Sequence, residues 1–160
     1  MGAAAGNRGA DDDRCAAARP SGTGGDPGEV VGAIDHGLLV LVCAQPSDTP
    51  ATAARFVDKV LKLRVFADQD GRMNRSVVEV GGGLLVVSQF TLAADTRSGN
   101  RPGFSGAAPP AQGQALYEHV LRIARERHAP VASGRFGADM QVHLVNDGPV
   151  TIPLQVADLD

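Results

Sequence analysis

Apolar residues recur at two different spacings along this chain, and each spacing predicts a different kind of element. Short apolar runs between Gly-, Asp- or Pro-containing turns are typical of strands. They occur at 30–34, 38–43, 64–67, 77–80, 83–92, 140–145 and 150–156. Apolar residues at helical spacing, with charges on the other face, predict helices at 50–63 and 111–127. The pattern therefore predicts an α+β fold with two helices.

Turn and cap residues refine these elements. The first two runs are joined by a turn at 35–37, which predicts a β-hairpin whose second strand is central. The first helix should begin at Pro50, because Pro suits the first helical position and Thr49 or Asp48 can cap it. Pro153 lacks a backbone N–H, so part of the last run should lie on a sheet edge or at a bulge.

Composition divides the chain into two parts. Residues 1–28 are biased to Gly, Ala, Arg, Asp and Pro without periodicity, so we expect them to be disordered or an altered start. Residues 29–160 should form one domain, with an aliphatic core because aromatic residues are only 4% of the chain. No apolar run reaches the roughly 18 residues of a membrane span, and no apolar segment follows Met1. We therefore expect a cytoplasmic protein without membrane contact.

Net charge limits the partners. The formal charge is −3 and the pI is about 5.7, which disfavours a broad duplex-binding face, so we expect no DNA partner. A protein that binds only one end of an RNA contacts few phosphates, so such binding is compatible with this net charge. Arg97 and Arg101 lie in a long loop at 93–110, and loops of this length are often functional. The two arginines fit a phosphate contact and ordinary solvated side chains equally well.

The run at 83–92 starts as a purely apolar strand and ends in Ser88, Gln89, Phe90 and Thr91. An unpaired buried hydroxyl or amide costs about 1–3 kcal/mol, so either the fold or a ligand must supply partners. We interpret this strand end as one wall of a small polar pocket. The second wall is expected far downstream, in the turn at 146–151.

Conventional catalytic patterns are absent from the sequence. It has no GxSxG, Walker A or GxGxxG motif, and its four histidines lack metal-ligand spacing, so we expect no metal and no cofactor. Ser88 and Thr91 have no evident base beside them, which disfavours a nucleophile relay. Cys15 and Cys43 form no CxxC pair and should be reduced thiols. A cis peptide at Gly148-Pro149 would fix its main-chain oxygens in one direction, but only about 5–6% of X–Pro bonds are cis.

Two segments resemble the signature motifs of the D-aminoacyl-tRNA deacylases. They are Ser-Gln-Phe-Thr-Leu at 88–92 and Asn-Asp-Gly-Pro-Val-Thr at 146–151. Shorter stretches that agree lie at 71–74, 101–104, 107–110 and 134–140, and the similarity runs from residue 29 to residue 156 in the family's order.

This resemblance implies a β-barrel-like mixed sheet with two helices and a homodimer. It implies hydrolysis of the ester that joins a D-amino acid, or glycine, to the terminal adenosine of tRNA. Gly148-Pro149 would be cis and would enter the partner's pocket, where its main-chain oxygens reject L-amino acids. The RNA's 2′-hydroxyl and a positioned water would replace an obligatory side-chain nucleophile. The residues implied are Ser88, Gln89, Phe90 and Thr91 in the catalytic pocket, and Met73, Arg101, Phe136, Met140, Asn146, Gly148 and Pro149 in substrate binding.

One part of the family pattern is absent, and three readings of the function stay open. The family's opening Val-rich strand has no counterpart in residues 1–26, so we expect that strand to be missing and a sheet edge to be exposed. Within the deacylase reading, Thr91 remains a candidate nucleophile. A second reading is a module that holds the 3′ end of tRNA without turnover. A third is a small-molecule esterase, which the missing His relay disfavours.

Overall fold

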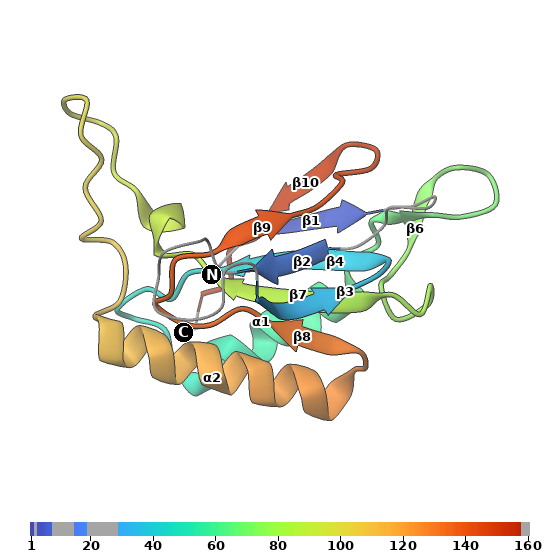
Figure 1. The fold of residues 1–160 in the computed structure, drawn as a ribbon, viewed down its shortest axis with the longest axis horizontal. Coiled ribbons are helices and arrows are strands. Elements are labelled where there is room, and N and C mark those ends of the chain that lie inside the picture. Colours follow the sequence, from blue (N-terminus) through green and yellow to red (C-terminus); the bar gives the residue numbers. More distant parts are fainter. Residues whose placement is uncertain (2, 8–14, 19–28, 158–160) are drawn as a thin grey trace.

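The computed structural model describes residues 1, 3–7, 15–18 and 29–157, with only the backbone described for 3–7 and 15–18. Figure 1 shows the arrangement of the elements. In chain order they are β1 (Ala3–Asn7), β2 (Cys15–Ala18), β3 (Val30–Ile34), β4 (Gly37–Val42), α1 (Pro50–Lys62), β5 (Phe66–Ala67), β6 (Met73–Arg75), β7 (Gly83–Ser88), the 3₁₀ helix η1 (Phe90–Ala93), α2 (Pro110–Arg127), β8 (Val131–Ser133), β9 (Gln141–His143) and β10 (Val150–Pro153).

A mixed sheet of order β10-β1-β4-β7-β8 lies between two layers. Strands β4, β7 and β8 run parallel, whereas β1 pairs antiparallel with β4 and with β10. The two helices cover one face of this sheet, and a three-stranded sheet of order β3-β2-β9 covers the other (Figure 1). The mixed sheet with two helices is as expected, but the sheets are open and do not close into a barrel.

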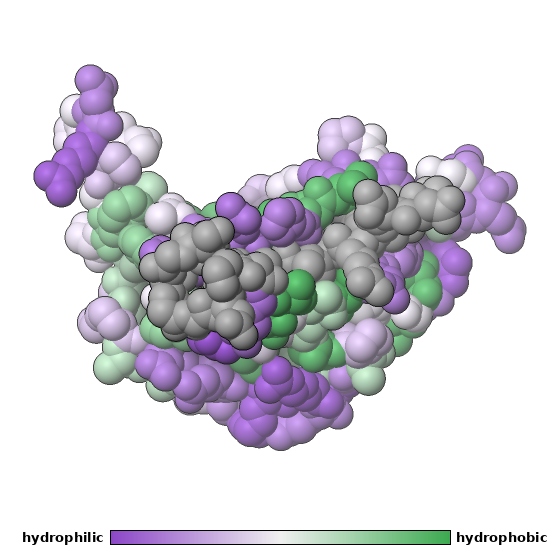
Figure 2. Space-filling view, in the orientation of Figure 1, coloured by the Kyte–Doolittle hydropathy of each residue, from purple (hydrophilic) through white to green (hydrophobic). Residues whose placement is uncertain are grey.

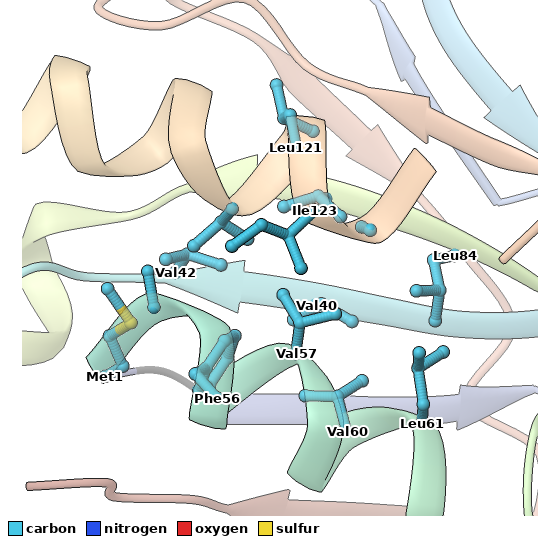
Figure 3. Packing of buried hydrophobic residues seen from close by; sticks show 14 of the residues in the cluster. Met1, Val40, Val42, Phe56, Val57, Val60, Leu61, Leu84, Leu121 and Ile123 are labelled. Carbon is cyan, nitrogen blue, oxygen red and sulfur yellow. The ribbon is translucent and has the colours of Figure 1, made fainter. Parts of the chain in front are cut away.

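The central strands β4 and β7 supply both cores because successive side chains of a strand point to opposite faces. The side chains on one face pack with the helices: Leu38, Val40, Val42, Leu84 and Val86. Those on the other face pack toward the three-stranded sheet: Leu39, Leu41, Leu85 and Val87. Figure 3 shows Val40 and Val42 of β4 between α1 and α2. These strands are buried on both faces, which explains their nearly continuous apolar sequences.

The first helix follows its sequence closely. Thr49 caps it: its side chain accepts from the Thr52 backbone N–H at 3.2 Å, and the Thr52 side chain accepts from the Thr49 N–H at 3.1 Å. This reciprocal pair is a capping box, with Pro50 in the first turn as expected. Helix α2 begins at Pro110, one residue before the predicted start, and ends at Arg127 as predicted. Pro153 lies in β10, an edge strand, as expected.

The amino-terminal segment differs from the expectation that no strand precedes residue 29. Ala3–Asn7 forms β1, which pairs with β4 and β10, and Cys15–Ala18 forms β2, which pairs with β3 and β9. A strand therefore precedes residue 29 in the sheet, and the expected exposed edge beside β4 is covered. These segments have the weak strand propensity of Ala, and their conformation follows from pairing on both sides. The rest of the expected disordered segment, residues 2, 8–14 and 19–28, lies outside the described residues.

Three local expectations were wrong. Strands β3 and β4 do not pair as a hairpin, because they belong to different sheets. Residues 77–80 form a turn, since the Ser76 N–H donates to the Glu79 carboxylate at 2.6 Å and the Glu79 N–H donates back to Ser76 Oγ at 3.3 Å. The strand at 83–92 ends at Ser88, and η1 follows it.

The start of β4 leaves no room for a side chain at Gly37, which pairs with Gly83 of β7. A Cβ on Gly37 would lie 2.0 Å from the carbonyl oxygen of Gly83, and no side-chain rotation could relieve this clash with backbone. We expect Gly37→Ala to lower the free energy of unfolding by about 3 kcal/mol, the upper end of the usual overpacking cost. Urea denaturation measures this. Gly103→Ala is the matched control, because its Cβ would meet nothing nearer than 4.0 Å; equal losses in both variants would contradict the prediction.

Candidate functional site

A cavity of about 720 Å³ opens where β4 and β7 end. The carboxyl end of β7, the start of η1, the first turns of α2 and the segment 135–140 surround it. Its walls are mainly apolar with a few polar groups, which is typical of a ligand pocket. Among the expected site residues, those that line it are Ser88, Gln89, Phe90, Phe136 and Met140.

The motif at 88–91 is held by the end of the parallel ladder. Ser88 pairs with Val42, and the Gln89 N–H donates to the Val42 carbonyl at 2.8 Å. The chain then turns into η1, where the Gln89 side-chain amide donates to the Thr91 hydroxyl. The Phe90 ring is 56% exposed and packs edge-on against Phe104, with 5.1 Å between ring centroids. The motif thus presents Phe90 and the polar residues Ser88 and Gln89 to the cavity, whereas Thr91 is not among the residues that line it.

Helix α2 supplies the floor. Tyr117 is 4% exposed and lines the cavity, and its ring lies 5.9 Å from that of Phe136. The Tyr117 hydroxyl donates to the carbonyls of Val86 at 2.9 Å and Gly134 at 3.1 Å. Burial raises the pKa of Tyr117 to about 12. The hydroxyl is therefore a neutral donor at physiological pH.

Cys43 lies between this cavity and a smaller one of about 380 Å³, and it lines both. The thiol is buried and free, and it lies 3.6 Å from the carbonyl oxygen of Phe90. Burial raises its pKa, so the thiol form dominates near neutral pH. Because a protonated thiol is a poor nucleophile, we assign Cys43 to the cavity wall rather than to the chemistry.

The cavity offers little conventional acid–base chemistry. Among the described residues that line it there is no histidine, and the one carboxylate is that of Asp139. Across residues 1, 3–7, 15–18 and 29–157, no three His, Cys, Asp or Glu side chains are grouped to hold a metal ion. In the same part of the chain, neither helix is long and apolar enough to cross a bilayer.

The turn at 146–151 is tightly organised. The Asn146 side chain donates to Thr151 Oγ1 at 2.8 Å and accepts from the Val150 N–H at 3.3 Å. The Gly148-Pro149 peptide is cis, and Gly148 has φ +129°, where a side chain is strained. Because a Cβ there would lie 2.9 Å from Val150 Cγ2, only glycine fits this turn without a shift.

A single chain does not bring this turn to the cavity. Val150 lies in β10 beside the start of β4, because both pair with β1 there, whereas Ser88 pairs with Val42 at the end of β4. Val150 is level with Leu38, because both pair with Gly6, and the four residue steps from Leu38 to Val42 span about 13 Å along the strand at the usual rise. In Figure 1 the turn between β9 and β10 lies on the side of β6, away from η1. Asn146, Gly148 and Pro149 are therefore not on the cavity of their own chain.

Two further expected residues also lie away from the cavity. Met73 is 55% exposed on β6. Arg101 is exposed and lies between Asp95 and Gly103 in sequence. The segment 93–110 that holds it projects from the body (Figure 1). The bridge between Asp95 and Gly103 closes the base of this projection, and Figure 2 shows its outer end as hydrophilic.

Comparison with known proteins identifies the family. The sequence pattern of the family described as D-Tyr-tRNA(Tyr) deacylase matches residues 14–155. The chain belongs to this family. A protein of Methylibium petroleiphilum named D-aminoacyl-tRNA deacylase is 70% identical over 129 residues, 81% of this chain and 85% of that protein. One of the same name from Pseudomonas aeruginosa is 64% identical over 128 residues, 80% of this chain and 88% of that protein.

Solved structures of similar proteins support the fold. A structure named c-Myc DNA Unwinding Element Binding Protein superposes with a TM-score of 0.84 at 35% identity, covering 99% of this chain and 100% of that one. A probable eukaryotic D-amino acid tRNA deacylase gives 0.75 at 17% identity, covering 96% and 97%. The likeness to the latter concerns the fold alone.

Sequence reasoning did not assign Tyr117 to the site of this family member. The helical pattern places it beside the apolar stripe of α2, where an aromatic residue is usually core. The available signal is its polar tip, because a buried Tyr hydroxyl needs a hydrogen-bond partner. Here those partners are two carbonyls behind the cavity.

The chain has one Tyr and no Trp, so the phenol absorbance reports Tyr117 alone. In the folded protein it should ionise near pH 12, and in urea near the ordinary value of about 10. Because the folded pKa is raised, the stability contributed by the neutral phenol is complete below pH 10 and is lost as pH rises toward 12. Spectrophotometric titration measures both values, and a folded midpoint at the urea value would contradict the burial argument.

Proposed function

We propose that this protein hydrolyses the ester bond of D-aminoacyl-tRNA, and of glycine mischarged on tRNA, and so removes wrongly charged amino acids before translation. The observation that carries the proposal is the cavity at Ser88, which has apolar and aromatic walls and little acid–base chemistry of its own. Membership of the deacylase family supports the same reaction. The products are free tRNA and the amino acid.

The ester linkage suits such a site. An aminoacyl ester next to a ribose hydroxyl is already reactive, so positioning it with a water can supply much of the rate. Ser88, Gln89, Phe90 and Thr91 position the ester, and the RNA's 2′-hydroxyl assists. Phe136 and Met140 form the opposite wall. No side-chain nucleophile is required, and Thr91, whose hydroxyl is engaged by Gln89, is a weaker candidate.

Chirality is selected by a second copy of the chain. The turn at 146–151 is organised yet lies about 13 Å along the strands from the cavity of its own chain, so it serves a partner's cavity in a homodimer. A two-fold dimer places the same turn in both sites at once. The main-chain oxygens at Gly148-Pro149 would then occupy the space that an L side chain needs. Exposed Leu144 and Val145 precede this turn and supply apolar surface for the contact.

Arg101 contacts RNA phosphate, whereas Arg97 is less available. Arg97 donates to Asp95 at 2.9 and 2.7 Å, and these bonds hold the pKa of the Asp95 carboxyl below its usual range. Both arginines lie on the projection beside the cavity mouth, where the strand leading to the 3′ end would pass. Met73 is assigned to substrate binding on its motif and its exposure alone. The acidic net charge fits a contact with one RNA end in the cytoplasm, with no DNA partner.

The decisive test is a paired deacylation assay on D-Tyr-tRNA and L-Tyr-tRNA with the full chain. We expect rapid loss of the D-ester and hydrolysis of the L-ester at least about 100-fold slower, because a built steric filter rejects the wrong hand strongly. Binding of the charged tRNA without turnover would favour the module that only holds the 3′ end. Equal rates for both hands would contradict the chirality filter.

Replacing Gly148 tests the turn. Gly148→Ala should cut D-Tyr-tRNA hydrolysis by about 100-fold, because the added Cβ meets Val150 and displaces the turn. Gly81→Ala is the matched control: Gly81 also has positive φ, with open space around it and no place in the site. Both variants should lose on the order of 1–2 kcal/mol of stability. If Gly148→Ala hydrolyses D-Tyr-tRNA as fast as wild type, the turn at 146–151 is not part of the site.

Subunit mixing asks which cavity the turn serves. A Phe136→Ala variant damages the cavity wall but keeps the turn. When it is refolded together with Gly148→Ala, half of the dimers are mixed, and each holds one intact site. About a quarter of wild-type activity should return. No recovery would place the turn and the cavity of one site on the same chain.

A further inference from the structure

Tyr117 has an unusual position for a core aromatic. Its ring lines the cavity, yet its hydroxyl points behind the wall, to carbonyls on two different segments. One is Val86 of β7 and the other is Gly134, which follows β8. A hydroxyl has one proton, so the two acceptors share it. This one group therefore joins α2, β7 and the segment after β8.

The segment 134–140 supplies six of the residues that line the cavity, Phe136 and Met140 among them. Few polar contacts attach it to the rest of the described chain, and one of them is the ion pair of Arg135 with Glu29 at 3.6 Å. The Gly134 N–H donates to the Val86 carbonyl at 2.9 Å, and the Arg135 N–H lies 3.3 Å from Met140 Sδ. Met140 also fills the space beside Gly134, where a Cβ would lie 3.1 Å from its Sδ. The centroid of the Phe136 ring lies 5.9 Å from that of the Tyr117 ring. The hydrogen bonds at Gly134 thus attach the start of this segment to β7 and α2, and the packing of Phe136 and Met140 on the two hydrophobic clusters adds to them.

We propose that Tyr117 is a positioning residue for the cavity wall formed by Phe136 and Met140. Its hydroxyl donates to the carbonyls of Gly134 and Val86 and so holds this wall in place for the terminal nucleoside of the substrate. This inference rests on the proposed function. It assigns the hydroxyl no part in the chemical step, since it faces away from the cavity.

The proposal predicts a separation of KM from kcat. The motif at 88–91 is attached to β4 through the Gln89 N–H and the Val42 carbonyl, independently of Tyr117. Loss of the hydroxyl should therefore loosen the binding wall and leave the reacting end in place. An effect on KM with kcat retained is the signature of lost binding common to ground and transition states, provided that KM reports affinity.

The experiment uses Tyr117→Phe, which keeps the ring and removes only the hydroxyl. We expect KM for D-Tyr-tRNA to rise about 10-fold, with kcat within about twofold, as one lost buried hydrogen bond implies. Val120→Ala is the matched control. It is buried on the same helix and lies outside the cavity, so it loses stability without changing KM. Circular dichroism establishes that both variants fold.

A second measurement separates this inference from the proposed function. The probe is adenosine carrying D-alanine on its 3′ position through an amide, with affinity measured by calorimetry in both proteins. We expect binding about 10-fold weaker in Tyr117→Phe. In wild type, the tyrosine fluorescence should also change on binding, because the Tyr117 ring lines the cavity. The signal comes from Tyr117 alone, since the chain has one Tyr and no Trp.

The outcomes are distinct. If wild type binds the amide but does not hydrolyse D-Tyr-tRNA, the proposed function fails while the positioning role is still decided by the two affinities. If KM and the amide affinity of Tyr117→Phe equal those of wild type, the positioning role is overturned. If Val120→Ala raises KM as much as Tyr117→Phe, the effect is general destabilisation and the proposal is likewise overturned. Failure of wild type to bind the amide overturns it as well.

Discussion

The parallel ladder between β4 and β7 is the constraint on which the rest of the structure depends. It aligns Gly37 with Gly83 at one end and Val42 with Ser88 at the other. Glycine is required at position 37 because a Cβ there would clash with the backbone of Gly83. The same register delivers Ser88 and Gln89 to the far edge, where the last ladder bond goes from Gln89 to Val42. The place of the cavity is thus fixed by strand pairing rather than by the loops around it.

The alternation of side chains along this ladder explains why the cavity has two unlike walls. One face of β4 and β7 packs with the helices, and the other packs toward the three-stranded sheet. Tyr117 comes from the helical layer, whereas Met140 packs against the cluster on the opposite face. At Ser88 the strand ends and no longer separates the layers. The cavity opens at this end, so residues from both layers can reach one ligand.

The parts that the sequence predicts are those decided locally. The capped helix at Pro50 and the doubly buried strands follow from cap chemistry and continuous apolar runs. The motifs at 88–91 and 146–151 identify the family, but only the first of them lies on the cavity of its own chain. The errors arose where distant pairing decides: Ala3–Asn7 is a strand because β4 and β10 flank it. The turn at 77–80 was missed because its Ser76–Glu79 bonds outweigh valine's preference for strands.

The distance between the cavity and the turn at 146–151 of one chain is the physical reason for the proposed dimer. A site without an evident side-chain base depends on the geometry in which it holds its substrate. The turn is held by the side chain of Asn146 and lies toward the opposite end of the strands from that cavity. In a two-fold dimer it would enter the other site as a rigid wall, so selection of the amino acid and positioning of the ester would be supplied by different subunits.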